Sequence, residues 1–102
     1  WGILGLMKTL AMELGPAGVR VNAICPGAVE GARMERMLAN QSKASGRDAD
    51  TIRAGYADGT SLRTWVTADD IADAAVWLAS DGASKVSGQA ITIDGHTETN
   101  SA

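Results

Sequence analysis

The sequence predicts an α/β fold in which two parallel strands are flanked by helices. Two short apolar runs, at residues 19–25 and 89–95, are rich in β-branched side chains and have the length of buried strands. The stretch between them, residues 26–88, carries helical periodicity and one well-marked helix start. Strands joined by such a long helical connection pair in parallel, through a right-handed crossover.

The chain opens with a helix predicted over residues 1–15. Its broad apolar face repeats at about 100° per residue and consists of Ile3, Leu4, Leu6, Met7, Leu10, Ala11 and Leu14. Gly15 and Pro16 are expected to end the helix, because glycine accepts a left-handed conformation and proline cannot continue the helix. The opposite face is small and apolar rather than charged, with Trp1, Gly2, Gly5, Thr9 and Met12. We expect that face to contact a second helix.

A strand and two short helices follow. The strand at residues 19–25 is broken by Pro26 and Gly27, which open a loop. Apolar spacing then predicts helices at residues 33–43 and 49–57, separated by a polar break.

The helix predicted over residues 67–81 has the clearest ends. Thr67 is its expected N-cap, and Asp70 completes a capping box in which aspartate replaces the usual glutamate. Asp69 and Asp70 are therefore expected to act as capping and dipole groups rather than as a catalytic pair. Gly82 follows the last turn and is the expected left-handed residue at its end.

Composition and charge exclude several classes of function. The chain has 102 residues and a formal net charge of −3, without the basic stripe that nucleic-acid binding needs. No apolar run approaches the roughly 20 residues of a membrane span. Cys25 is the only cysteine, so no internal disulfide can form, which fits a reducing cytoplasm. One histidine and one cysteine give no metal-binding cluster.

The predicted elements leave apolar surface that the chain cannot cover. Two parallel strands do not make a stable sheet, and the first helix presents more apolar surface than two strands can bury. The apolar pattern also runs from Trp1 without a capping residue ahead of it. We expect Trp1 to mark the point at which a longer chain was cut.

Catalytic machinery is nearly absent from the sequence. Neither a glycine-rich dinucleotide turn nor a phosphate-binding loop occurs. Cys25 is expected to be a small buried residue at a strand end, and His96 a solvated residue of a loose polar tail.

Two stretches of the chain closely resemble the short-chain dehydrogenase/reductase family. The first runs from Gly5-Leu6-Met7-Lys8 through Gly15-Pro16 to Arg20-Val21-Asn22-Ala23-Ile24-Cys25-Pro26-Gly27. The second is Ser87-Gly88-Gln89-Ala90-Ile91-Thr92-Ile93-Asp94-Gly95. The resemblance implies the C-terminal portion of a Rossmann-type doubly wound parallel sheet. It also implies an NAD(P)-dependent oxidoreductase that interconverts an alcohol and a ketone.

The resemblance places the catalytic Tyr, Lys and Ser of the family upstream of this chain. Tyr56 is the only tyrosine, and position 60 is Thr60 rather than a lysine, so the Tyr-x-x-x-Lys motif is not matched. No catalytic residue is therefore assigned, and the isolated chain is expected to be inactive.

The family resemblance assigns residues 26–62 to the cofactor turn and the substrate lid. The residues expected to contact the nicotinamide end of NAD or NADP are Pro26, Gly27, Ala28, Val29 and Gly31. Many relatives carry a threonine at the position of Gly31, so the hydroxyl contact is missing or replaced here. The residues that could face the small-molecule substrate are Glu30, Arg33, Met34 and Met37, although methionine at helical spacing is more often packing.

The resemblance further implies a homo-oligomer, a dimer or a tetramer. The long helix at residues 1–15 would form one interface, and Trp77 is the candidate contact at a second. An alternative hypothesis is a shortened, non-catalytic interaction module that associates with full-length relatives through these helices.

Overall fold

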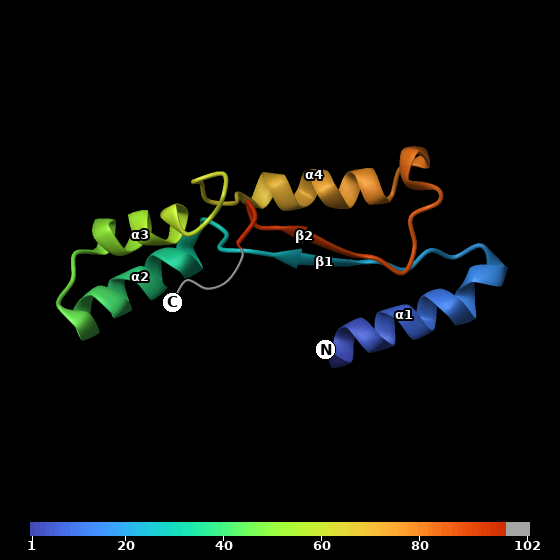
Figure 1. The fold of residues 1–102 in the computed structure, drawn as a ribbon, viewed down its shortest axis with the longest axis horizontal. Helices are drawn as coiled ribbons and strands as arrows, with labels where there is room; N and C mark the ends of the chain where they lie inside the picture. The colour runs from blue at the N-terminus through green and yellow to red at the C-terminus, as the bar shows by residue number, and fades with distance from the viewer. Residues whose placement is uncertain (98–102) are drawn as a thin grey trace.

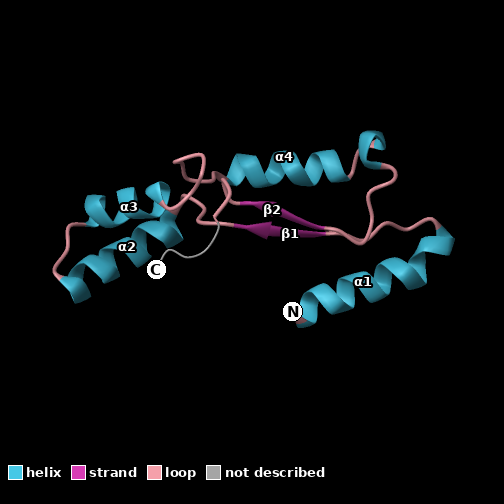
Figure 2. Cartoon of the chain, in the orientation of Figure 1, coloured by secondary structure: helices cyan, strands magenta, loops and turns pink. Residues whose placement is uncertain are grey.

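The computed structural model describes residues 1–97, which form two strands, four α-helices and two short 3₁₀ turns (Figures 1 and 2). In chain order the elements are α1 (Gly2–Leu14), η1 (Gly15–Ala17), β1 (Ala23–Pro26), α2 (Ala32–Ser45), α3 (Ala49–Asp58), α4 (Ala68–Leu78), η2 (Asp81–Ala83) and β2 (Ala90–Ile93).

The two strands pair in parallel, which confirms the predicted α/β arrangement. Their register matches Ala23 with Ala90 and Pro26 with Ile93. The connection between them contains α2, α3 and α4, and α4 lies along the strands (Figure 1). Ala75 and Leu78 of α4 line a shallow cavity together with Ile24 of β1.

Side chains set the register where the two strands begin. The Asn22 side chain donates from Nδ2 to the carbonyl of Val86 at 2.9 Å and accepts at Oδ1 from the N–H of Gln89 at 3.1 Å. We call this pair of hydrogen bonds the Asn22 clamp. Next to it, the N–H of Val21 donates to Ser87 Oγ at 3.2 Å. Strand β1 starts at Ala23 rather than at the predicted residue 19. Just before Ala23 the two segments are joined by a mixture of side-chain bonds and one backbone bond, in which the N–H of Gly88 donates to the carbonyl of Val21 at 2.8 Å.

Glycine allows close approach where the two strands end. A Cβ atom at Gly27 would lie 2.5 Å from the Cβ of Asp94 and 2.8 Å from its Cα, distances that real Cβ atoms do not tolerate. The N–H of Gly27 also donates to the carbonyl of Ile93 at 2.9 Å. The parallel pair is therefore hydrogen-bonded at both ends, by the Asn22 clamp and by the bond from the Gly27 N–H to the Ile93 carbonyl, beside which Gly27 leaves no room for a side chain next to Asp94.

The turn after helix α1 differs from the sequence-based expectation. Gly15 keeps right-handed helical angles and begins η1, and the left-handed residue is Gly18, with φ of 81°. The α-helix ends at Leu14, as predicted from Gly15 and Pro16. Only the predicted left-handed conformation of Gly15 was wrong, because Pro16 fits the first turn of a 3₁₀ helix and moves the left-handed residue to Gly18. Met7 is buried and Ala11 approaches Gly88, whereas other apolar side chains of α1 are exposed. These exposed residues are Trp1, Ile3, Leu6, Met12 and Leu14.

Helix α4 begins with the predicted capping box. Thr67 Oγ1 accepts from the N–H of Asp70 at 3.1 Å, and Asp70 Oδ2 accepts from the N–H of Thr67 at 2.8 Å. The expected end at Gly82 was wrong, because α4 ends at Leu78, its C-cap Ala79 is right-handed, and Gly82 lies within η2.

Replacing Thr67 with alanine should lower the free energy of unfolding by about 1 kcal/mol, because one N–H of the first turn loses its acceptor.

Hydrogen bonds from Thr67 hold the pKa of Asp70 below its ordinary value. The stabilisation by Asp70 is therefore complete above the ordinary carboxylate pKa and is lost as the pH falls through the lowered pKa. Urea denaturation across acidic pH tests both effects. Asp70→Asn should flatten the acid-side loss, and Thr51→Ala on exposed α3 surface is the control for the Thr67 substitution.

The described chain is elongated. Its principal extents are 55 × 26 × 23 Å and its radius of gyration is 16.9 Å, against about 13 Å for a compact domain of 100 residues. Buried apolar side chains are few, namely Met7, Leu38, Ile52, Val66 and Ala83. Figure 1 shows α4 on one side of the strands and α1 on the other, with α2 and α3 beyond the strand ends. Within residues 1–97, no helix combines the length and apolar character needed to cross a membrane.

Candidate functional site

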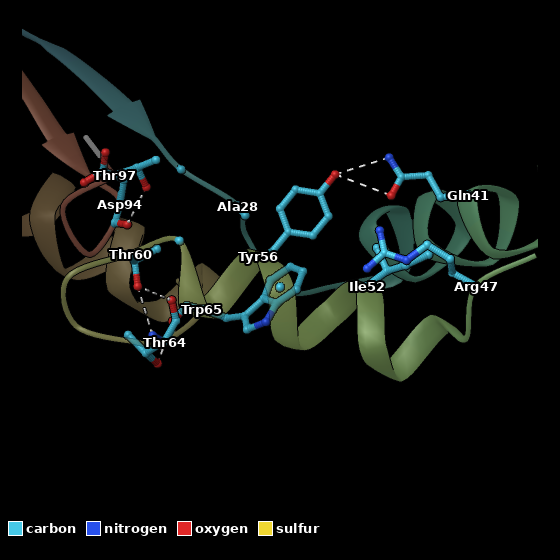
Figure 3. A pocket seen from close by; sticks show the side chains of 13 residues that line it. Ala28, Gln41, Arg47, Ile52, Tyr56, Thr60, Thr64, Trp65, Asp94 and Thr97 are labelled. Carbon is cyan, nitrogen blue, oxygen red and sulfur yellow. Dashed lines mark hydrogen bonds between the residues drawn. The ribbon is translucent and has the colours of Figure 1, made fainter. Parts of the chain in front are cut away.

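A cavity of about 760 Å³ lies beyond the carboxyl ends of β1 and β2, where ligands bind in parallel α/β sheets (Figure 3). Helices α2 and α3, the segment before α4 and the residues after β2 enclose it. Its lining residues are Gly27, Ala28, Gln41, Arg47, Ile52, Gly55, Tyr56, Gly59, Thr60, Thr64, Trp65, Asp94 and Thr97.

The loop after β1 is fixed by a short parallel bridge between Val29 and Val66. The N–H of Glu30 donates to the carbonyl of Val66 at 2.8 Å, and the N–H of Val66 donates to the carbonyl of Ala28 at 3.2 Å. Parallel pairing of this kind uses the residues on either side of Val29. The N–H and carbonyl of Val29 itself therefore face away from Val66.

Only part of the predicted cofactor turn reaches the cavity. Gly27 and Ala28 line it, whereas Pro26, Val29 and Gly31 do not. Gly31 caps α2 with φ of 155°, a conformation that side-chain-bearing residues rarely adopt. A glycine at this position is therefore explained by the backbone.

The predicted substrate residues lie on α2 or just before it, outside the cavity lining. Glu30 and Arg33 are exposed, and Met34 and Met37 are half-buried. Their contact with a substrate stays a prediction.

Sequence reasoning missed the wall that α2, α3 and the segment before α4 provide. The rings of Tyr56 and Trp65 lie 5.8 Å apart, tilted by 54°, beside buried Ile52. Gln41 Nε2 donates to the Tyr56 hydroxyl at 3.2 Å. The only available signal was the rarity of aromatic residues, which form 4% of the sequence, since their convergence depends on how α2 and α3 fold together.

An ion pair joins α2 to α3 behind this wall. The Arg53 guanidinium contacts Glu35 through two N–O pairs of 2.6 Å each, and its Cζ lies 5.9 Å from the centre of the Trp65 ring. Trp65 Nε1 donates to the carbonyl of Arg53 at 3.2 Å. The hydrogen bond from Arg53 lowers the pKa of Glu35, so the pair stays charged in mildly acidic solution. These contacts align Trp65 with the cavity.

The segment after β2 is tied to the turn that follows α3. Thr60 is buried; its hydroxyl donates to the carbonyl of Ala57 at 2.9 Å and accepts from the N–H of Thr64 at 3.1 Å. Ser61 Oγ and His96 Nδ1 are 2.5 Å apart, and the N–H of Ser61 donates to the carbonyl of His96 at 3.0 Å. His96 is exposed as expected, but it is bonded to this turn rather than part of a loose tail; residues 98–102 of that tail lie outside the described residues.

The described part of the chain holds no cluster of metal ligands. Residues 1–97 contain no group of three or more His, Cys, Asp or Glu side chains that could hold a metal ion. Cys25 is half-buried within β1.

Comparison with known proteins identifies the family. A family model for enoyl-(acyl carrier protein) reductase matches residues 1–96. D-beta-hydroxybutyrate dehydrogenase of Rhizobium meliloti (strain 1021) is 34% identical over 95 residues, which cover 92% of this chain and 37% of that protein.

Solved structures agree with this match. L-sorbose reductase from Gluconobacter frateurii, complexed with NADPH and L-sorbose, has a TM-score of 0.86 at 25% identity. The match covers 97% of this chain and 38% of the reductase chain. 4-hydroxyisoleucine dehydrogenase complexed with NADH has a TM-score of 0.77 at 29% identity, and the match covers 98% of this chain and 37% of the dehydrogenase chain. The chain thus spans little more than a third of the length of these proteins. With almost its whole described length matched, it belongs to the short-chain dehydrogenase/reductase family and has the α/β fold of a Rossmann-type sheet.

Proposed function

We propose that this chain serves as the C-terminal part of an NAD(P)-dependent oxidoreductase that interconverts an alcohol and a ketone. In this role it supplies the wall against which the nicotinamide lies and the lid over the substrate. The bound nicotinamide would supply or accept the hydride. The chain's own residues would orient the cofactor and enclose the substrate.

One observation carries the proposal: the loop after β1 presents a backbone donor and acceptor, unpaired among residues 1–97, at the carboxyl end of a parallel strand. The bridge to Val66 fixes Val29 and leaves its N–H and carbonyl facing the other way. A donor next to an acceptor is complementary to a carboxamide. Gly27 and Ala28 line the adjoining cavity, so cofactor and substrate could meet there.

Relatives support a nicotinamide cofactor without choosing between its two forms. One similar structure is complexed with NADPH and another with NADH. We propose that the cofactor is NAD or NADP, that the protein is cytoplasmic, and that it forms a homo-oligomer. The exposed apolar side chains Ile3 and Met12 on α1 and Trp77 on α4 support the last of these.

The test uses the complete reading frame that encodes this chain. We expect it to contain a glycine-rich turn and a Tyr-x-x-x-Lys motif, and its product to oxidise NADH or NADPH in the presence of ketones. Val29→Pro should weaken cofactor binding by about tenfold or more, because it removes one backbone donor without touching the bridge hydrogen bonds. Val29→Ala keeps that donor and is the matched control.

Two results would contradict the proposal: equal cofactor affinity for the Val29→Pro and Val29→Ala proteins, or no ketone-dependent oxidation of either cofactor. The 102-residue chain alone provides a further check. Calorimetric titration of it with NADH and NADPH should give no saturable heat.

The second candidate function is an interaction module. Its support is the exposed apolar surface of α1, where Ile3 is 78% and Met12 79% exposed. A stable 102-residue species that co-purifies with a full-length relative would favour this candidate, provided that the reading frame contains no upstream catalytic motif.

A further inference from the structure

The cavity has two chemically different ends (Figure 3). Asp94 and Thr97 lie at the end near the strands, and Gln41 and Arg47 lie at the other, with the rings of Tyr56 and Trp65 between them. Among the lining residues within 1–97, Arg47 is the one cation and Asp94 the one carboxylate. A ligand that spans the cavity therefore meets opposite charges at its two ends.

Arg47 is held by its backbone while its guanidinium is left available. Its N–H donates to Ser45 Oγ at 3.2 Å, and its carbonyl accepts from Ser42 Oγ at 2.5 Å. Over the described residues, neither a side-chain hydrogen bond nor an ion pair engages its guanidinium. A guanidinium offers a planar fork of N–H donors that matches a carboxylate.

The same short network fixes the neighbouring amide. Ser45 Oγ donates to the carbonyl of Gln41 at 2.7 Å, and the Gln41 side chain bonds the Tyr56 hydroxyl. The Gln41 side chain and the Arg47 backbone are thereby held at one end of the cavity before any ligand arrives. Ile52 and the ring of Trp65 give the middle of the cavity an apolar wall.

We infer that the cavity selects a substrate with an apolar body and a carboxylate, and that Arg47 binds this carboxylate at the end away from the strands. The inference rests on the proposed function, because it names the substrate class of the same site. A single cation suits a singly charged carboxylate better than a phosphate monoester, which carries close to two charges at neutral pH. Repulsion from Asp94 disfavours the reversed orientation.

The experiment compares straight-chain oxo acids of increasing length with their methyl esters, using the product of the complete reading frame. The best acid should exceed its ester in kcat/KM by about tenfold, the effect of one charge-assisted hydrogen-bonded pair. Arg47→Gln should remove this preference by raising KM with little change in kcat, since the contact exists before and during reaction. Arg36→Gln, on the exposed surface of α2 outside the cavity lining, should leave the preference intact.

A binding measurement keeps the inference separate from catalysis. The unreactive probe 4-phenylbutyrate, followed by tryptophan fluorescence, should bind about tenfold more weakly to the Arg47→Gln protein, and its binding should weaken with added salt. If ketones are reduced but acids and esters react equally, or if Arg47→Gln behaves like Arg36→Gln, the inference is overturned while the proposed function stands. If no ketone is reduced, the proposed function fails. Independently of that result, equal binding of the probe to the Arg47→Gln and Arg36→Gln proteins would reject the role of Arg47.

Discussion

Replacing Gly27 with alanine should cost about 2–3 kcal/mol of unfolding free energy, because the added methyl group overpacks a site that cannot give way. The new Cβ would lie 2.8 Å from the Cα of Asp94, and that backbone atom cannot rotate aside. The strand ends must separate, which strains the hydrogen bond from the Gly27 N–H to the carbonyl of Ile93. Urea denaturation followed by circular dichroism measures the loss.

Gly55→Ala is the matched control for this substitution. Gly55 lies inside α3, and a Cβ atom added there would meet nothing within 4 Å. Alanine at this position should be neutral or should stabilise by about 0.5–1 kcal/mol, since glycine is a poor helix residue. Equal stability of the Gly27→Ala and Gly55→Ala proteins, with unmoved amide resonances at Asp94, would show that the close approach is not a constraint.

The second large effect is expected at the Asn22 clamp. Asn22→Ala removes one donor and one acceptor, and leaves the half-buried carbonyl of Val86 and the N–H of Gln89 without these partners. Two such hydrogen bonds contribute about 1 kcal/mol each, so a loss of about 2 kcal/mol is expected. Amide hydrogen exchange should show the consequence locally, with faster exchange at Ala23 and Gln89.

Asn40→Ala on the exposed surface of α2 is the control for the clamp. It should change stability little or raise it slightly, because alanine is the better helix residue. Asn22→Asp keeps the acceptor but loses the donor and places a charge next to the carbonyl of Val86. Full stability of Asn22→Asp would mean that the donor half of the clamp is unimportant.

Local patterns in the sequence were sufficient to predict the parallel pair of strands and the start of helix α4. The β-branched runs predicted both strands, and Thr67 with Asp70 predicted the capping box, because each signal acts within a few residues. Glycine positions were less informative. Gly15 follows the last residue of α1 as predicted, and Gly82 does not follow the last turn of α4. Neither glycine takes the predicted left-handed conformation, because each lies in a 3₁₀ turn set by neighbouring residues.

The candidate site was only partly predictable. The Pro-Gly break after the first strand predicted a ligand-contacting turn, and two residues of that turn, Gly27 and Ala28, line the cavity. The far wall could not be inferred, because Gln41, Tyr56 and Arg47 converge only through the packing of α2 against α3. The spacing of apolar residues along a helix predicts which face is buried, but it does not reveal which other element packs against that face.

The Asn22 clamp and the hydrogen bond from the Gly27 N–H to the Ile93 carbonyl both lie outside residues 32–58, which include α2 and α3. The hydrogen bonds that fix the register at the two strand ends thus use no residue of that segment. Mutations, insertions or deletions can accumulate there during evolution while the sheet stays in place. New chemical preferences can therefore arise by changes in α2 and α3, while the strand ends keep the hydrogen bonds that pair them.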